Sequence, residues 1–223
     1  MKRVWMLCCI PIIIMVLSGG SALREPANFT DYFTIEPKRE RNYSNMSEQL
    51  GFYASQSKIT FIEGKTFGYR FICGVDTLLV DTDGIKMVKR EEMEKGAAEL
   101  TFEPPILLLP SELVKNKHVE LSGTITAKSH KGEISKGTYS GYVKVLNTDA
   151  TVIIDGQPRE NCLQIERRHY CELPDGYVWD DRVTEEYLVG IGLVKETAKV
   201  IRVTQEGEEQ IEDVVRTLVG WFD

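Results

Sequence analysis

The chain has 223 residues, a formal net charge of −7 from 27 Lys+Arg and 34 Asp+Glu, and 42% hydrophobic residues. This length suits one domain with a proper core. The acidic balance argues against nucleic acid and anionic membrane surfaces as partners, because both bind to cationic protein faces.

The first 22 residues have the order of a secretory signal peptide. Lys2 and Arg3 precede an apolar run, Val4–Leu17, which small residues follow. The run is shorter than the ~20 residues that span a bilayer, and no later segment is long enough. We therefore predict cleavage after Ala22 and export to the periplasm or the outside of the cell, with no integral membrane segment left. An uncleaved anchor is the alternative.

The rest of the chain divides into a polar lead-in and a region with β patterns. Residues 23–50 carry scattered aromatic residues without a clear period, so we expect an irregular segment that packs on the domain. From residue 51 to the C-terminus, alternating apolar residues and turns rich in Gly and Asp indicate about nine or ten short strands. The stretch Glu91–Glu99 has a helical composition. Residues 211–222 combine helical spacing with β-branched residues and Gly220, and we expect a strand there.

These patterns predict a mainly β fold over residues 51–223. We expect a single curved antiparallel sheet that forms an open or half barrel, with little helix.

The stretch Thr101–Pro110, TFEPPILLLP, places four large apolar residues between prolines. Pro104 and Pro105 lack backbone donors, so we expect them at a strand start or on an edge. Apolar side chains on both faces of a short strand indicate burial on both faces. Two interpretations stay open: core packing under residues 23–50, or a pocket for an apolar or amphiphilic ligand.

Three stretches, in order, resemble a pattern of exported bacterial proteins of the TapB-like family. They are FEPPILLLPSELVKNKHVELSGTI, ENCLQIE at 160–166 and EYLVGIGLVKE at 186–196. The family's first pattern often carries a Trp, where this chain has Glu120 or Leu121. The resemblance implies a curved sheet similar to the open barrels of the LolA and LolB lipoprotein carriers, which hold lipid chains on their concave face. It implies no catalytic residues.

Two glycines share one face of the predicted strand over 186–196. Missing side chains there would let the sheet coil or let another element approach closely. Together with the leucine run they form our set of predicted ligand-lining residues: Ile106, Leu107, Leu109, Gly190 and Gly192.

Three cysteines follow the signal segment: Cys73, Cys162 and Cys171. In an oxidising compartment we expect one disulfide and one spare thiol, with three unpaired buried cysteines as the alternative. Cys162 and Cys171 can bond only if the chain turns back between them, because one straight strand would hold them roughly 30 Å apart.

Residue patterns for catalysis and metal binding are incomplete. His118, His130 and His169 lack a second ligand at metal spacing, and Asp81–Gly84 matches a calcium loop only in part. We therefore predict no enzyme activity, no metal and no cofactor. The sequence favours an exported binding module for a lipid or another apolar or amphiphilic ligand. The alternative is a structural or interaction protein that contacts another protein of the cell envelope.

Overall fold

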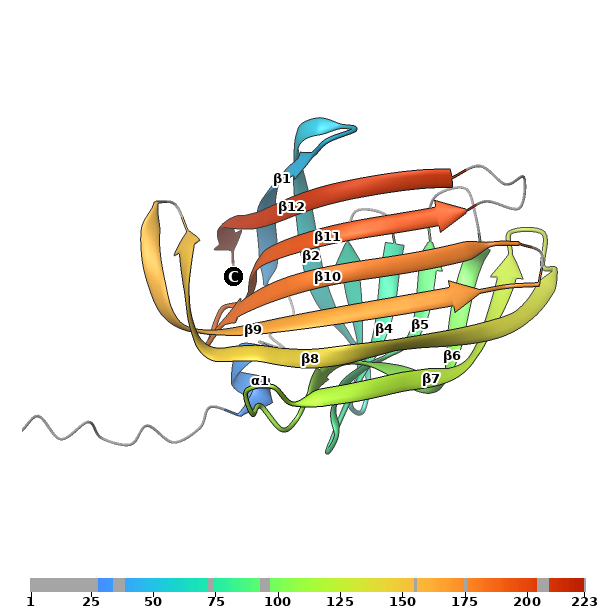
Figure 1. The fold of residues 1–223 in the computed structure, drawn as a ribbon, viewed down its shortest axis with the longest axis horizontal. Helices are drawn as coiled ribbons and strands as arrows, with labels where there is room; N and C mark the ends of the chain where they lie inside the picture. The colour runs from blue at the N-terminus through green and yellow to red at the C-terminus, as the bar shows by residue number, and fades with distance from the viewer. Residues whose placement is uncertain are drawn as a thin grey trace, which may run out of the picture.

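The structure is a computed structural model that describes residues 28–33, 39–71, 74–92, 97–154, 156–174, 176–203 and 209–222. Within these ranges there is one short helix, α1 (Phe29–Tyr32), and the remaining elements are strands (Figure 1). The strands are β1 (Glu40–Ser47), β2 (Gly51–Glu63), β3 (Thr66–Phe71), β4 (Gly74–Asp81), β5 (Gly84–Glu92), β6 (Ala97–Pro110), β7 (His118–Ser129), β8 (Ile134–Ile154), β9 (Gln157–Glu172), β10 (Val178–Leu188), β11 (Gly192–Val203) and β12 (Glu209–Phe222).

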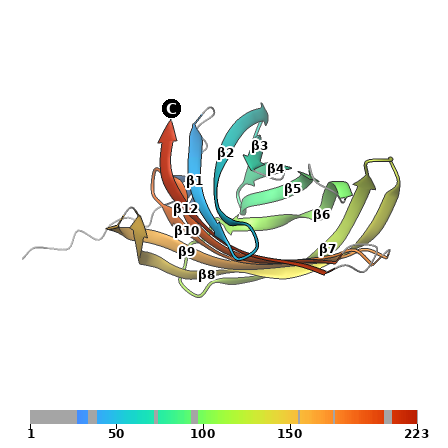
Figure 2. The same cartoon turned by 90° about the horizontal axis from the view of Figure 1, so that it is seen from above.

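The strands form one antiparallel barrel in which each strand pairs with its neighbours in the chain. β1 pairs with both β2 and β12, and this pairing closes the barrel. Figure 2 shows that β8–β12 form a long curved layer, and that β2–β6 lie opposite it. The predicted mainly β, antiparallel fold with little helix is confirmed. The barrel is closed rather than open or half open.

The closing strand β1 comes from the range that we expected to be irregular. Its inward positions hold Arg41, Tyr43, Asn45 and Ser47, all buried. The buried residues alternate with less buried ones along the strand, but three of the four are polar. The sequence therefore shows no alternation of apolar and polar residues that would have predicted a strand. Within residues 23–50 the structure therefore contains a strand, and α1 precedes it.

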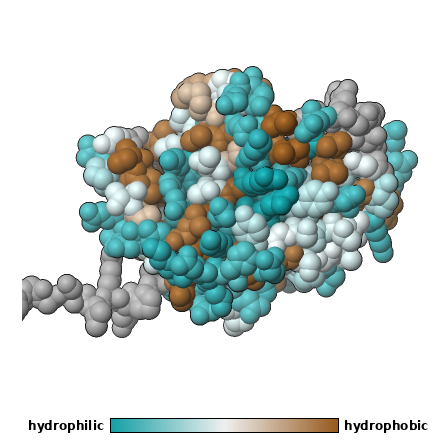
Figure 3. Space-filling model, in the orientation of Figure 1, coloured by the Kyte–Doolittle hydropathy of each residue, from teal (hydrophilic) through white to brown (hydrophobic). Residues whose placement is uncertain are grey.

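Alternating side chains along β9 and β10 separate an inner from an outer face. Inward residues of β10 face the barrel interior, whereas Asp180 and Arg182 face outward. Asp180 accepts from Arg168 at 2.8 Å and from Arg182 at 2.9 Å. Figure 3 shows hydrophilic side chains over the middle of this outer face, with apolar side chains between and around them.

The leucine run lies on β6 with side chains buried on both faces, as predicted. Ile106 is 0%, Leu107 8% and Leu109 1% exposed. Pro104 and Pro105 lie within β6 and not at its start, which was one of the two places that we expected, the other being an edge. The pairing with β7 ends at Glu103, and the register with β5 omits residues 102–105. The prolines thus occupy a break in both ladders, where their missing donors cost no ladder hydrogen bond.

Two other sequence predictions can be compared with the strands. Glu91–Glu99 does not form a helix where it is described, because β5 runs to Glu92 and β6 begins at Ala97. The C-terminal segment is strand β12, as expected. Across the described residues, no helix combines the length and the apolar character that crossing a membrane requires.

The cysteines that the structure describes are both buried, and they form no disulfide with one another. Cys162 and Cys171 lie on the same strand, β9, and belong to different hydrophobic clusters. An extended strand keeps them too far apart to bond with one another. Cys73 and the predicted signal segment lie outside the described residues.

We expect Ile106→Ala to lower the free energy of unfolding by about 2–5 kcal/mol, because it leaves a cavity in the core. The matched control is Ile134→Ala on β8, whose side chain is 68% exposed, and which should change stability by less than ~0.5 kcal/mol. Urea denaturation of both variants measures the difference. Equal effects would contradict the burial of the leucine run.

Candidate functional site

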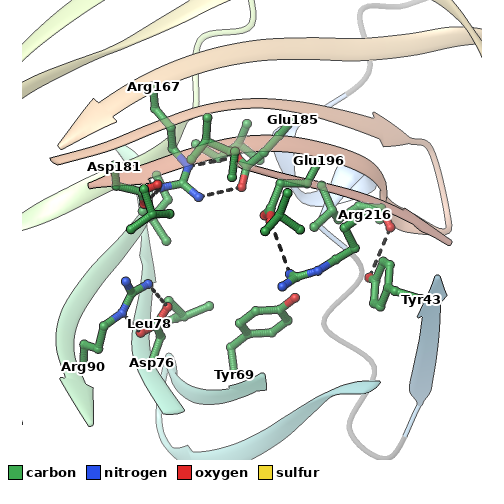
Figure 4. Close-up of a pocket in the computed structure, with 18 of the residues that line it drawn as sticks. Tyr43, Tyr69, Asp76, Leu78, Arg90, Arg167, Asp181, Glu185, Glu196 and Arg216 are labelled. Atoms are coloured by element: carbon green, nitrogen blue, oxygen red, sulfur yellow. Dashed lines mark hydrogen bonds and ion pairs between the residues drawn. The ribbon is translucent and has the colours of Figure 1, made fainter. Parts of the chain in front are cut away.

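A cavity of about 170 Å³ lies inside the barrel. Its walls come from α1's flank, from β1–β6 on one side and from β9–β12 on the other. Figure 4 shows charged and tyrosine side chains from both layers around one space. The site therefore depends on barrel closure, because no single layer supplies the whole lining.

The β9–β10 wall carries a buried ion-pair group around Arg167. Its Nη2 donates to Glu185 Oε1 at 2.8 Å and its Nε donates to Oε2 at 3.1 Å. Asp181 Oδ2 lies 3.4 Å from Nη1. Tyr187 donates its hydroxyl to Glu185 at 2.9 Å. One guanidinium thus holds two carboxylates on the same wall.

Burial and neighbouring charges act in opposite directions on this group. Burial alone would lower the pKa of Arg167, but the carboxylates of Glu185 and Asp181 outweigh it and raise the pKa well above its usual value. Burial raises the pKa of Asp181 despite the nearby guanidinium. The ion pairs therefore offset the desolvation of the carboxylates only in part.

A second ion pair lies on the opposite wall. Arg90 of β5 makes two hydrogen bonds to Asp76 of β4, at 2.7 and 2.8 Å. The same guanidinium carbon lies 4.6 Å from the ring centroid of Trp179 on β10. This cation–π contact joins the two layers across the interior.

The third pair lies near the closing strand. Arg216 of β12 is 3.4 Å from Glu196 of β11 and donates to Asn45 of β1 at 3.2 Å. Its guanidinium carbon lies 5.6 Å from the ring centroid of Tyr43. Burial raises the pKa of Glu196, and the Glu196 carboxylate raises that of Arg216.

Of the predicted ligand-lining residues, the structure brings two to the cavity. Leu109 and Gly192 line it, together with Leu108, which the prediction left out. Ile106 packs in the main hydrophobic cluster, and Gly190 lies in the exposed turn between β10 and β11. Leu107 is buried in β6, away from the described lining. Contact of any of them with a ligand stays a prediction.

Gly192 has a specific role beside the cavity. Its φ is +97°, and a Cβ there would lie 3.4 Å from Nη2 of Arg41. That distance is an ordinary van der Waals contact, so the backbone conformation, and not the space beside Arg41, favours glycine here. The Nε of Arg41 donates to the carbonyl of Ile191 at 3.0 Å. Gly190 instead donates its backbone N–H to the carbonyl of Asp31 at 2.8 Å, which fixes α1 against the turn.

The charged lining residues were missed at the level of sequence. Inward and outward positions of β10 both hold acidic residues, for example Asp181 and Asp180. The alternation of polar and apolar residues along β10 therefore does not show which face of the strand points inward. The usable signal is the spacing of Trp179, Asp181 and Tyr187, whose odd numbers place them on one strand face.

His169 is buried between the layers. Its Nδ1 lies 3.3 Å from Nη1 of Arg167, and because a guanidinium can only donate, Nδ1 accepts and the ring is neutral. Burial, with the charges of Arg167 and Arg90, lowers its pKa well below the usual value. Among the residues that the structure describes, no group of three or more His, Cys, Asp or Glu side chains could hold a metal ion.

Comparison with known proteins gives weak similarity. No protein-family model and no curated protein sequence matches the chain. Two solved structures match the chain at low similarity. One is a candidate lipoprotein from Parabacteroides distasonis, with a TM-score of 0.41, 9% identity and coverage of 84% of this chain and 96% of that one.

The other is a candidate exported protein with a YmcC-like fold from Bacteroides fragilis. Its TM-score is 0.32 at 7% identity, and the match covers 84% of this chain and 97% of that one. These values assign neither a family nor a function. The resemblance to TapB-like proteins therefore stays a prediction from the sequence.

Replacing Arg167 by Met should lower the free energy of unfolding by about 3–5 kcal/mol, because it leaves two buried carboxylates without their cation. In the variant, the burial that raises the pKa of Asp181 would act without the guanidinium, so Asp181 would hold a proton more tightly in the folded than in the unfolded state, and stability should recover as pH falls. The control is Arg182→Met on the outer face, with an expected loss below ~1 kcal/mol. Chemical denaturation at several pH values tests this, and a pH-independent deficit would contradict it.

The buried imidazole of His169 predicts a second pH dependence. Its folded pKa is lowered, so below about pH 6.5 the unfolded chain takes up a proton that the folded chain excludes. The free energy of unfolding should therefore fall, by up to ~1.4 kcal/mol per pH unit, as pH decreases from 6.5. We expect His169→Asn to remove this component and His130→Asn, in an exposed turn, to keep it. Parallel denaturation curves from pH 5 to 8 compare the three proteins.

Proposed function

We propose that this chain is an exported, non-enzymatic binding module that holds a small amphiphilic ligand inside its barrel. The observation that carries the proposal is the interior cavity of about 170 Å³, whose lining combines leucine, valine and aromatic side chains with ion pairs. A mixed lining of this kind suits a ligand with an apolar part and a polar part.

The volume limits the size of the ligand. An engineered apolar cavity of about 150 Å³ binds benzene. A ligand of similar bulk fits the barrel interior, whereas a full lipid chain exceeds it. This narrows the sequence-based expectation of a lipid carrier to a compact amphiphile.

A non-enzymatic role is supported by how the charged groups are engaged. Asp76, Glu185 and Glu196 each face a guanidinium that lines the same cavity. Such pairs place each carboxylate against a fixed cationic partner, an arrangement suited to recognition more than to proton transfer. Export is supported by the N-terminal sequence, which has the order of a signal peptide.

The test reduces the cavity volume by replacing a small residue of the lining with a larger one. Ala198 of β11 lies between Val183 and Val214 on the inner face, and all three line the cavity. We expect protein purified from the exported fraction of its native host to release a small amphiphile on extraction. Ala198→Leu should release much less of it, because the added carbons occupy the ligand's space.

The matched control is Thr197→Leu, the neighbouring exposed residue on the opposite face of β11. It should release as much compound as the wild type, as measured by mass spectrometry of equal amounts of folded protein. Thermal unfolding checks both variants, since overpacking can cost about 1–3 kcal/mol. Wild-type protein that releases no compound would favour the alternative, an envelope interaction protein without a small-molecule ligand.

A further inference from the structure

We infer that the barrel interior selects ligands of zero net charge, zwitterionic or uncharged, over singly charged molecules of the same size. This inference rests on the proposed function and names the ligand class for the same cavity. It follows from the balance and pairing of the charges that line the interior.

The lining carries equal numbers of positive and negative side chains. Four arginines and four carboxylates form the main set: Arg41, Arg90, Arg167 and Arg216 with Asp76, Asp181, Glu185 and Glu196. The half-buried Arg202 and Glu212 add one charge of each sign. The interior is therefore neutral whether or not this last pair is counted.

The close pairing of these charges makes the balance hard to change. Four ion-pair contacts join Arg90, Arg167 and Arg216 to the four carboxylates, with N–O distances of 2.7–3.4 Å. A ligand with one charge would enter the partly buried interior without a counter-ion, or would have to separate an existing pair. Both carry a desolvation penalty that the Coulomb attraction of one new contact does not offset.

The cavity lining suits a ligand that has no net charge but carries separated positive and negative groups. Figure 4 shows charges of both signs around the space, with Arg90 and Asp76 opposite Arg167 and Glu185. A donor and an acceptor on the same molecule can therefore each find a partner of opposite sign. Leu78 faces the same space in Figure 4 and suits a short apolar group.

Four probes with a six-carbon skeleton test the selection on the complete mature protein. They are 1-hexanol, norleucine, hexanoate and hexylammonium, titrated at pH 7.5 and followed by calorimetry and by chemical shifts of interior residues. We expect hexanol and norleucine to bind, and each ion to bind at least about tenfold more weakly. If the ions bind as tightly as the neutral probes, the inference is overturned and the proposed function stands. If none of the four binds, the proposed function is overturned together with the inference.

Charge variants test the cause of the selection. Glu196→Gln makes the interior net positive, and should improve hexanoate binding relative to hexanol by at least about tenfold. Arg216→Gln should do the same for hexylammonium. The double variant restores neutrality and should return the wild-type preference.

Lys58→Gln serves as the control, because Lys58 pairs with Glu40 on an exposed part of β2, and the preference should not change. Thermal unfolding confirms that each variant is folded. The wild-type probe series decides the inference by itself if a single variant fails to fold. Unchanged preferences in folded single variants would contradict the role of charge balance.

Discussion

The pairing of β1 with β12 is the constraint on which the rest of the structure depends. It joins the two ends of the sheet and converts a curved layer into a closed wall. Closure buries much of the inner face, so the charged groups that are buried there need partners inside the barrel. The ion pairs of Arg90, Arg167 and Arg216 meet this need, and the cavity between them exists only because the wall is closed.

The fold class could be predicted from the sequence because most strands bury apolar side chains with period 2. β7 shows this pattern, with Ile125 and Ala127 inward. β1 escaped prediction because its buried positions are mostly polar, and their partners lie on strands far away in sequence, for example Arg216 for Asn45. The break in pairing at Pro104 and Pro105 could not be located inside β6 from the sequence, because such a break depends on both neighbouring strands at once.

Of the residues that line the cavity, the sequence predicted only uncharged ones. Leu109 and Gly192 were identified because a leucine run and paired glycines are unusual in themselves. Arg167 and Glu185 belong to common residue types, and the chain is 27% charged. Only the register of β9 with β10 shows that they face each other. An interior of this kind is more costly than an apolar core, which is why we connect it with recognition rather than stability.

The pairing of β1 with β12 also affects how the barrel folds. β1 and β12 are the first and last strands that the structure describes, so the seam joins segments that lie far apart in the sequence. Contacts of such high sequence separation form slowly. During synthesis or translocation, the arginines and carboxylates of the inner face stay hydrated until the final strand emerges and docks. Loss of that strand would leave the charged wall open to water along its whole length.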